Sequence, residues 1–218
     1  IAISSCAKKE ESDESGSSNQ TNTSFGKFIS VGQTGTILTS SDGISWDNVS
    51  SGSTENLRAV AYGNKTLAIA GYSGTILTSN DAVTWTTRTS GTSENLGCIS
   101  YGNSTFVAVG NSGTIITSTD GINWTSRTSG TSKNLWGITY GNNKWVTGGD
   151  NGSVFSSTDG INWTSRISGT DQELNDVIYK KDKFIFFGYA GVIITSSDGI
   201  TWTSRTSGTV SKLASGSL

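Results

Sequence analysis

The feature that most constrains the fold of this chain is a repeat with a fixed period of 39 residues. The segment "TSSDGISWDNVSSGSTENLRAVAYGN", from Thr39 to Asn64, returns 39 residues later as "TSNDAVTWTTRTSGTSENLGCISYGN", and parts of it return three more times. No insertion separates the five copies, which is typical of proteins built from repeated supersecondary units. Several positions are the same in every copy, among them Asp42, Asp81, Asp120, Asp159 and Asp198, Trp46, Trp85, Trp124, Trp163 and Trp202, and Leu57, Leu96, Leu135, Leu174 and Leu213.

Each repeat contains four short runs rich in β-branched and aromatic residues, separated by Gly and Asn. In the third repeat these runs read "LWGITYG", "FVAVG", "TIITS" and "NWTSRT". Such runs favour strands, and none has a helical period over a useful length. Four strands in a unit of about 40 residues are typical of a β-propeller blade. A β-solenoid is the less favoured alternative, because its coils are usually shorter. The sequence therefore predicts an all-β propeller.

The repeated segment Ser40-Ser41-Asp42-Gly43-Ile44-Ser45-Trp46 resembles the Asp-box, or BNR, repeat of sialidase-like propellers. In style the chain is similar to the photosystem II assembly and stability factor type, and the resemblance covers residues 25–218. The copies omit the residue that usually stands between Asp and Gly, and the second copy has Ala82 in place of Gly. The residues themselves predict a structural role, in which each Asp accepts backbone hydrogen bonds within its turn and each Trp is a buried apolar plug.

The two ends of the repeat region suggest how the ring closes. The chain starts its first unit at "GKFISVG", which matches the second strand of the other units, so the first blade lacks an inner strand. The last run, Leu213–Leu218, is in register with an inner strand and could supply it. We therefore expect five four-stranded blades closed by the N- and C-terminal strands, which would leave no open sheet edge. A truncated larger propeller, or one completed by another chain, is the alternative.

The composition excludes several classes of function. The chain has a net charge of −2 and no basic stripe, so we expect no nucleic-acid partner. It has no His, the commonest general base and transition-metal ligand. A lone Asp in each turn does not supply a calcium site, so we expect no metal and no cofactor. No catalytic motif is present, and of the arginines only Arg58 is expected near the channel. Arg88, Arg127, Arg166 and Arg205 are expected on outer strands. We therefore expect no enzyme, and a sialidase-like hydrolase is the least favoured reading.

The N-terminus resembles the end of a bacterial lipoprotein signal peptide. Residues 1–6, "IAISSC", form a short apolar run that ends in small residues and Cys6. Residues 7–24 are charged and polar and suit a disordered tether, and residues 25–218 form the propeller domain. We expect a lipid on Cys6 and a place in the cell envelope, at the outer membrane or cell surface. The alternative is an ordinary disordered N-terminus with an incidental cysteine. Cys98, in an apolar run, is expected to be a small buried thiol.

Candidate ligand-binding residues are found where the repeats differ. Positions 33, 72, 111, 150 and 189 vary inside a constant Gly frame, and so do positions 58, 97, 136, 175 and 214. If strands alternate in direction, both sets lie at the end of the propeller opposite the aspartate turns. Variation there fits a ligand that breaks the symmetry, or else relaxed constraint in exposed loops. The candidates are Arg58, Tyr72, Asn111, Trp136, Asp150 and Tyr189.

The leading functional reading is a monomeric, non-catalytic binding or assembly module that is anchored to a bacterial membrane by a lipid. It would bind a protein or glycan partner on one face of the propeller. The alternative is a surface adhesin that recognises glycans or host proteins through that face. A third reading is a scaffold whose incomplete ring pairs with another chain.

Overall fold

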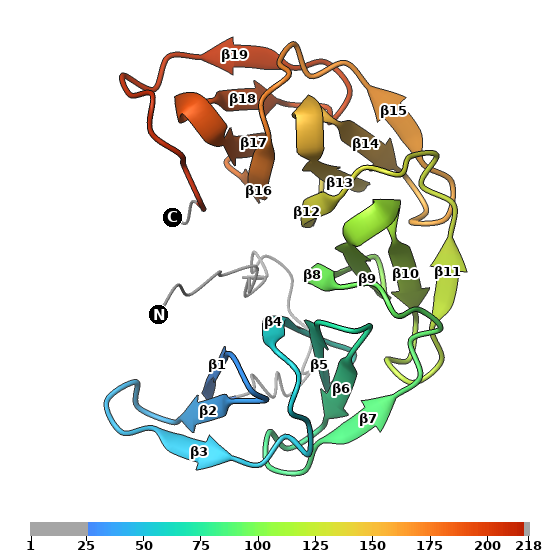
Figure 1. Cartoon of the computed structure of the whole chain (residues 1–218), viewed down its shortest axis with the longest axis vertical. Coiled ribbons are helices and arrows are strands. Elements are labelled where there is room, and N and C mark those ends of the chain that lie inside the picture. The colour runs from blue at the N-terminus through green and yellow to red at the C-terminus, as the bar shows by residue number, and fades with distance from the viewer. Residues whose placement is uncertain (1–25, 216–218) are drawn as a thin grey trace, which may run out of the picture.

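The computed structural model describes residues 26–215, and they form five antiparallel sheets that follow one another along an arc (Figure 1). Each sheet is an up-and-down meander, and each corresponds to one repeat of the sequence. The β-branched and aromatic runs form the strands, and the Gly- and Asn-rich segments between them form the turns. The five-bladed, all-β architecture predicted from the 39-residue period is therefore confirmed.

Four of the blades have four strands. Blade 2 contains β4 (Leu57–Gly63), β5 (Thr66–Gly71), β6 (Ile76–Ser79) and β7 (Thr86–Arg88). Blade 3 contains β8 (Leu96–Gly102), β9 (Thr105–Gly110), β10 (Ile115–Ser118) and β11 (Thr125–Arg127). Blade 4 contains β12 (Leu135–Gly141), β13 (Lys144–Gly149), β14 (Val154–Ser157) and β15 (Thr164–Arg166). Blade 5 contains β16 (Leu174–Lys180), β17 (Lys183–Gly188), β18 (Ile193–Ser196) and β19 (Thr203–Arg205).

Blade 1 has three strands, β1 (Phe28–Val31), β2 (Ile37–Ser40) and β3 (Asp47–Val49). It lacks an inner strand among the described residues, as the sequence predicts. The predicted closing strand falls partly outside them, because residues 216–218 are not described. The first part of this segment lies against blade 5, where the Leu213 N–H donates to the Gly188 carbonyl at 2.9 Å. The Leu57 N–H, at the start of β4, donates to the Gly32 carbonyl of blade 1 in the same way. In the part of the chain that is described, this segment is not a strand and does not pair with β1.

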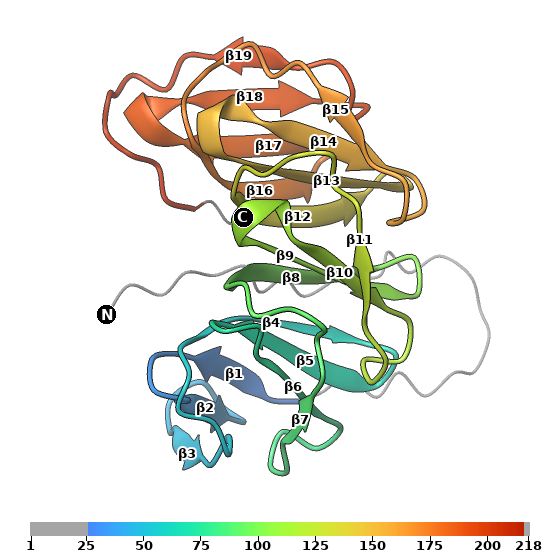
Figure 2. The same ribbon diagram turned by 45° about the vertical axis from the view of Figure 1, so that its right-hand side comes forward.

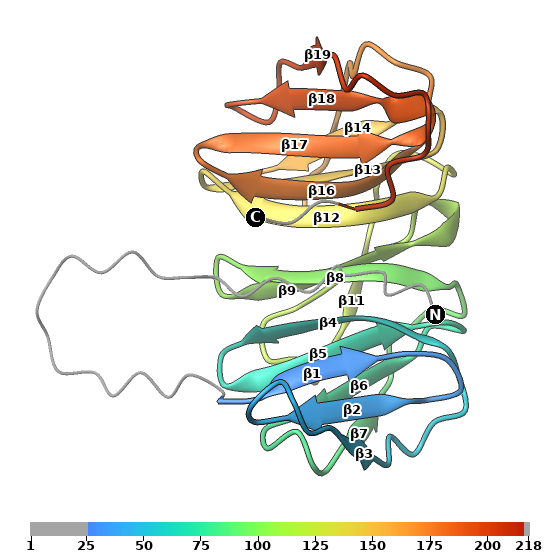
Figure 3. The same cartoon turned by 90° about the vertical axis from the view of Figure 1, so that its left-hand side faces the viewer.

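The core lies between the blades. The inner strands β4, β8, β12 and β16 lie side by side, one above another in Figure 3, and Figure 2 shows the sheets stacked along the arc. Side chains from facing sheets form apolar clusters; in one of them Ala68 and Ile76 of blade 2 meet Phe106 and Ile116 of blade 3. The glycine Gly148 allows one such contact, because a Cβ there would lie 2.7 Å from the ring of Phe186 in the next blade.

Cys98 belongs to one of these clusters and is fully buried, as its apolar run predicts. The expectation of a thiol is wrong, because Cys98 is disulfide-bonded in the structure. The chain has two cysteines, and the other, Cys6, lies outside the described residues. The predicted signal remnant (1–6) and tether (7–24) also lie outside them.

Candidate functional site

The inner strand of each four-stranded blade contains a β-bulge at its start. In β4 the pairing with β5 shifts between Leu57 and Ala59, so that Arg58 has no partner in the ladder. The equivalent shifts in β8, β12 and β16 leave out Gly97, Trp136 and Asn175. A bulge redirects the side chain of the extra residue. The bulge position therefore coincides with one of the two variable positions of the repeat.

The second variable position begins the tight turn between the second and third strands. In blades 3, 4 and 5 this turn is a single 3₁₀ turn: η1 (Asn111–Gly113), η2 (Asp150–Gly152) and η3 (Tyr189–Gly191). Its first N–H bonds the residue that precedes the inner strand, as from Asp150 to the Asn134 carbonyl at 3.0 Å. Tyr72 bonds the Asn56 carbonyl in the same way at 2.9 Å. Both variable positions therefore lie at the same end of the propeller, which we call the bulge end.

Blade 4 shows the most developed pair at the bulge end. The indole Nε1–H of Trp136 donates to Asp150 Oδ1 at 2.7 Å, and the Asn134 N–H donates to Asp150 Oδ2 at 3.3 Å. Trp136 is half-buried, and its ring edge lies 3.7 Å from where a Cβ would stand on Gly97 of the neighbouring inner strand. Gly97 thus makes room for the indole, which stays partly exposed to solvent.

Blade 2 pairs a cation with an aromatic ring. The guanidinium carbon of Arg58 lies 5.7 Å from the centre of the Tyr72 ring, within cation–π range. Arg58 Nε is buried and has no hydrogen-bond partner among the described residues. A buried donor without an acceptor is unfavourable, so an acceptor supplied by a ligand would stabilise this arrangement.

The other candidates lie at the same end but in separate blades. Tyr189 is 41% exposed, and the ammonium of Lys212 lies 4.2 Å from its ring centre and donates to its hydroxyl at 3.1 Å. Asn111 begins η1 and is half-buried. Sequence reasoning missed Lys212, although it stands where the repeats have Asn56, Asn95 and Asn134. The pairs Trp136–Asp150 and Arg58–Tyr72 each lie within one blade, whereas Lys212 follows β19, the last strand of blade 5.

Acidic groups accompany the Trp136–Asp150 pair. The pKa of Glu173 is raised above its usual value, chiefly by burial and also by the charge of Asp150, while the nearby Lys212 partly opposes the shift. Glu173 replaces the Asn of earlier repeats at this position. Two carboxylates, Asp150 and Glu173, therefore lie near each other at the bulge end, with Lys212 beside Glu173, while Arg58 supplies a positive charge in blade 2.

The repeated aspartates lie at the opposite end, in the turns between the third and fourth strands, which we call the aspartate turns. In the first of them Asp42 Oδ1 accepts from the N–H groups of Ile44 and Ser45 at 2.8 and 2.9 Å, and from the Ser40 hydroxyl at 3.0 Å. The equivalent hydrogen bonds in the second and fifth turns lower the pKa of Asp81 and of Asp198 to about 2. The largest causes are the backbone N–H groups of Thr84 and Thr201. The pKa values of Asp120 and Asp159 are lowered further, because an Asn side chain also donates to each.

The tryptophans of these turns pack against the core clusters but are less buried than the sequence predicts. Trp124 lies 6.3 Å from the ring of Phe106 and donates from Nε1 to the Gly121 carbonyl at 3.0 Å. It keeps an exposed edge, as do Trp85, Trp163 and Trp202. Trp46 is 43% exposed, because no blade precedes it in the described part of the chain. The indoles predicted to be buried plugs therefore pack between neighbouring blades but are only partly buried.

No group of three or more His, Cys, Asp or Glu side chains in residues 26–215 is arranged to hold a metal ion. Within the same range, no helix is long and apolar enough to span a bilayer.

The stacked four-stranded meanders define the chain as a β-propeller. Its fold is similar to that of YCF48 bound to D1 peptide, with a TM-score of 0.66 and 16% identity over 84% of this chain and 64% of that one. It is also similar to YCF48 from Cyanidioschyzon merolae, with a TM-score of 0.64 and 14% identity over 85% of this chain and 70% of that one. The WD40 β-propeller domain of Doa1 gives a TM-score of 0.61 and 17% identity, over 78% of this chain and 61% of that one.

At these identities the likeness shows the fold alone. The chain spans less than two thirds of the peptide-bound YCF48 structure, 64% of its length. No protein-family model matches the chain, and no curated protein matches its sequence.

Proposed function

We propose that this protein is a non-catalytic binding and assembly module that holds a segment of a partner protein at its bulge end. The observation that carries the proposal is the coincidence of two features in each of the four blades that have four strands. The positions that vary between repeats are the ones that the bulge and the tight turn present at one end. The aspartate turns, in which every repeat keeps the same Asp and Trp, serve as Asp-box-type scaffold at the other end.

The chemistry of the bulge end suits a protein segment. Trp136 offers a flat apolar surface, Arg58 a donor without an acceptor, and Tyr189 an exposed ring with a hydroxyl. Aromatic and Arg side chains with a few polar groups are the usual composition of binding hot spots. The similarity to a propeller that carries a bound peptide supports the same reading.

An array of immobilised proteins and peptides, run beside a glycan array, tests the proposal. We expect protein or peptide ligands whose binding falls at least tenfold in Trp136→Ala and in Arg58→Ala. The control Lys183→Ala changes an exposed side chain at the other end of blade 5 and should bind as the unchanged protein does. Ligands that bind all three variants equally would contradict the proposed site.

Glycan recognition by a surface adhesin is the second candidate, because a half-buried indole beside a carboxylate, as in Trp136 and Asp150, also suits a sugar ring. Binding to glycans alone, lost in Trp136→Ala, would favour the adhesin over the assembly module.

We also propose that the protein is anchored in a bacterial envelope, at the outer membrane or cell surface, through a lipid on Cys6. The support is the order of apolar run, small residues, cysteine and polar tether in the sequence. We expect the protein expressed with a complete signal to partition into detergent, and Cys6→Ser to release it. Equal solubility of both forms would end this part of the proposal.

A further inference from the structure

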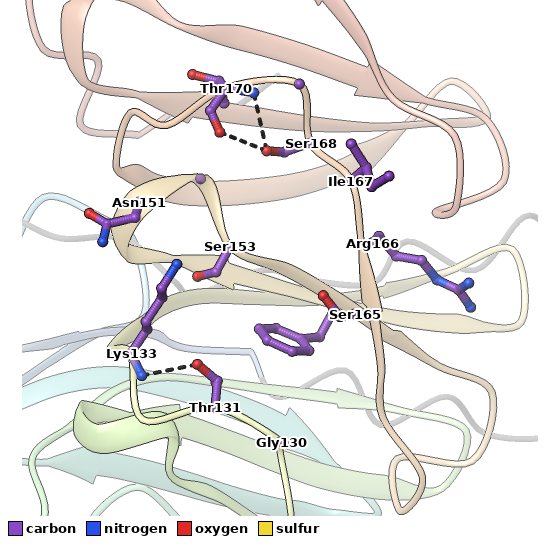
Figure 4. Close-up of a pocket in the computed structure, with 13 residues that line it drawn as sticks. Gly130, Thr131, Lys133, Asn151, Ser153, Ser165, Arg166, Ile167, Ser168 and Thr170 are labelled. Atoms are coloured by element: carbon purple, nitrogen blue, oxygen red, sulfur yellow. Dashed lines mark hydrogen bonds between the residues drawn. The ribbon is translucent and has the colours of Figure 1, made fainter.

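A surface hollow of about 510 Å³ lies at the bulge end of blade 4, where Asn151, the residue after Asp150, is part of its lining (Figure 4). Its walls come from three segments: the loop 130–133 that leads into β12, the turn η2, and residues 165–170 at the end of β15 and beyond. Gly152 brings two of these walls together, because a Cβ on it would collide with the Thr170 carbonyl oxygen. The hollow is therefore built by backbone that the repeat holds in place.

The hollow is positively charged. Its lining includes the cations Lys133 and Arg166 and no Asp or Glu. Arg166 points away from the hollow in Figure 4, and its Nε–H donates to Ser156 Oγ at 2.8 Å, so Lys133 is the cation that a ligand would meet. The equivalent positions in blades 2, 3 and 5 are Glu55, Glu94 and Gln172. Blade 4 therefore has a positive charge where two blades have a negative charge and one has a neutral amide.

Two further substitutions distinguish the hollow from its counterparts in the other repeats. Ser153 replaces a Thr of the first three repeats, and its buried hydroxyl has no hydrogen-bond partner in the described residues. Ile167 replaces Thr or Ser and is 88% exposed, while the buried ring of Phe155 also lines the hollow. A cation, a hydroxyl and two apolar side chains therefore line the hollow of blade 4, where blades 2 and 3 have an acid, a threonine, one apolar side chain and a second threonine at the equivalent positions.

We propose that this hollow binds a carboxylate carried on a short apolar stem, with Lys133 facing the charge and Phe155 and Ile167 facing the stem. Such a group is the side chain of Glu or a chain terminus in a partner protein, or else a free short-chain carboxylic acid. The first source rests on the proposed function, because the hollow would then extend the binding surface beside Asp150. The free-acid source does not.

Titration of the ¹⁵N-labelled protein, followed by the backbone amide shifts of Asn151, Gly152 and Gly169, tests the proposal. The probes are butyrate, its uncharged analogue butyramide, and an acetylated Gly-Ser-Glu-Ser-Gly amide with its Gln counterpart. We expect butyrate to bind at least threefold more tightly than butyramide, the scale of one exposed ion pair. Binding of the Glu peptide over the Gln peptide supports the protein source, and binding of butyrate alone supports the free acid.

The repeats supply matched variants that should fold normally, because each introduces a residue already used at the same position. Lys133→Gln copies position 172 and should abolish the preference for butyrate, and Ser153→Thr copies position 114 and should weaken it. Glu94→Gln, the control in blade 3, should leave binding unchanged. Equal shifts with butyrate and butyramide, or no effect of Lys133→Gln, would overturn the proposal. Partner binding that is lost in Trp136→Ala but kept in Lys133→Gln, with no butyrate binding, would overturn the hollow and leave the proposed function intact.

Discussion

At the scale of single residues, the aspartates of the five turns make the same set of hydrogen bonds. The aspartate Oδ1 accepts two backbone N–H bonds and one serine hydroxyl bond, which close the turn between the third and fourth strands of the repeat. The tryptophans are less uniform. Trp46, Trp124 and Trp163 donate to a glycine carbonyl of the turn, whereas the buried Nε1 atoms of Trp85 and Trp202 have no partner in the described residues.

The aspartates make stability depend on acid. Their folded pKa of about 2 in Asp81 and Asp198 lies below the usual value, 3.8, so folding favours the charged form. The stabilisation is present above the unfolded pKa and is lost as the pH falls through about 2. We expect the melting temperature to drop between pH 4 and pH 2, and to drop less in Asp198→Asn, which accepts hydrogen bonds but does not titrate. Asp171→Asn, at an exposed loop position, is the control. A profile unchanged by Asp198→Asn would contradict the expectation.

Two tryptophans separate scaffold from candidate site. Trp124→Ala removes a side chain packed against Phe106 and the cluster between blades 2 and 3, and should lower the free energy of unfolding by about 2–4 kcal/mol. Trp136→Ala removes a half-buried indole and one hydrogen bond and should cost about 1–2 kcal/mol. Denaturant unfolding of both variants measures the difference. An equal loss would mean that Trp136 serves packing, and the proposed site would lose its central residue.

At the scale of elements, the strands followed from the sequence because alternating β-branched runs leave few other structures open to them. The bulges did not: nothing in "LRAVAYG" or "LWGITYG" marks Arg58 or Trp136 as unpaired, since a bulge depends on the register of two strands. The variable positions were visible in the repeat, but their pairing, such as Trp136 with Asp150, depends on side-chain geometry. The hollow was missed, although Lys133 stands out against Glu55 and Glu94 in the aligned repeats.

The C-terminal segment offers a prediction at this scale. Leu213 bonds the Gly188 carbonyl, Asn175 Nδ2 donates to the Leu213 carbonyl at 3.0 Å, and the Ser215 hydroxyl donates to Asp176 Oδ2 at 2.8 Å. Deletion of residues 213–218 removes these bonds and uncovers the edge of β16. We expect a melting temperature several degrees lower, at the scale of two or three hydrogen bonds. A control that changes Val210 to Ser, at an 86% exposed position, should melt as the full chain does. Unchanged melting after the deletion would show that the segment does not brace blade 5.

At the scale of the whole molecule, the blades at the two ends of the arc expose faces that the inner blades cover. Phe28 of blade 1 is 56% exposed, whereas its counterparts Phe106 and Trp145 are fully buried. On the far side of blade 5, Ile185 is half-buried where its counterpart Val146 is fully buried. The uncovered face of blade 5 continues the interface that joins each blade to the next. The described residues therefore have an apolar sheet face at each end of the arc.

The equivalent isoleucines Ile115 of blade 3 and Ile193 of blade 5 test whether these end faces are open in solution. Ile115 is 1% exposed and packs between blades 3 and 4, whereas Ile193 is half-buried on the uncovered face. Ile115→Ala should lower the free energy of unfolding by about 2–5 kcal/mol, because it leaves a cavity in a closed interface. Ile193→Ala should cost less than half as much, because water already reaches the site and no cavity forms. Denaturant unfolding at several protein concentrations measures both. Equal losses that do not change with concentration would mean that the ring closes on itself, and a loss at Ile193 that grows with concentration would mean that copies associate through this face.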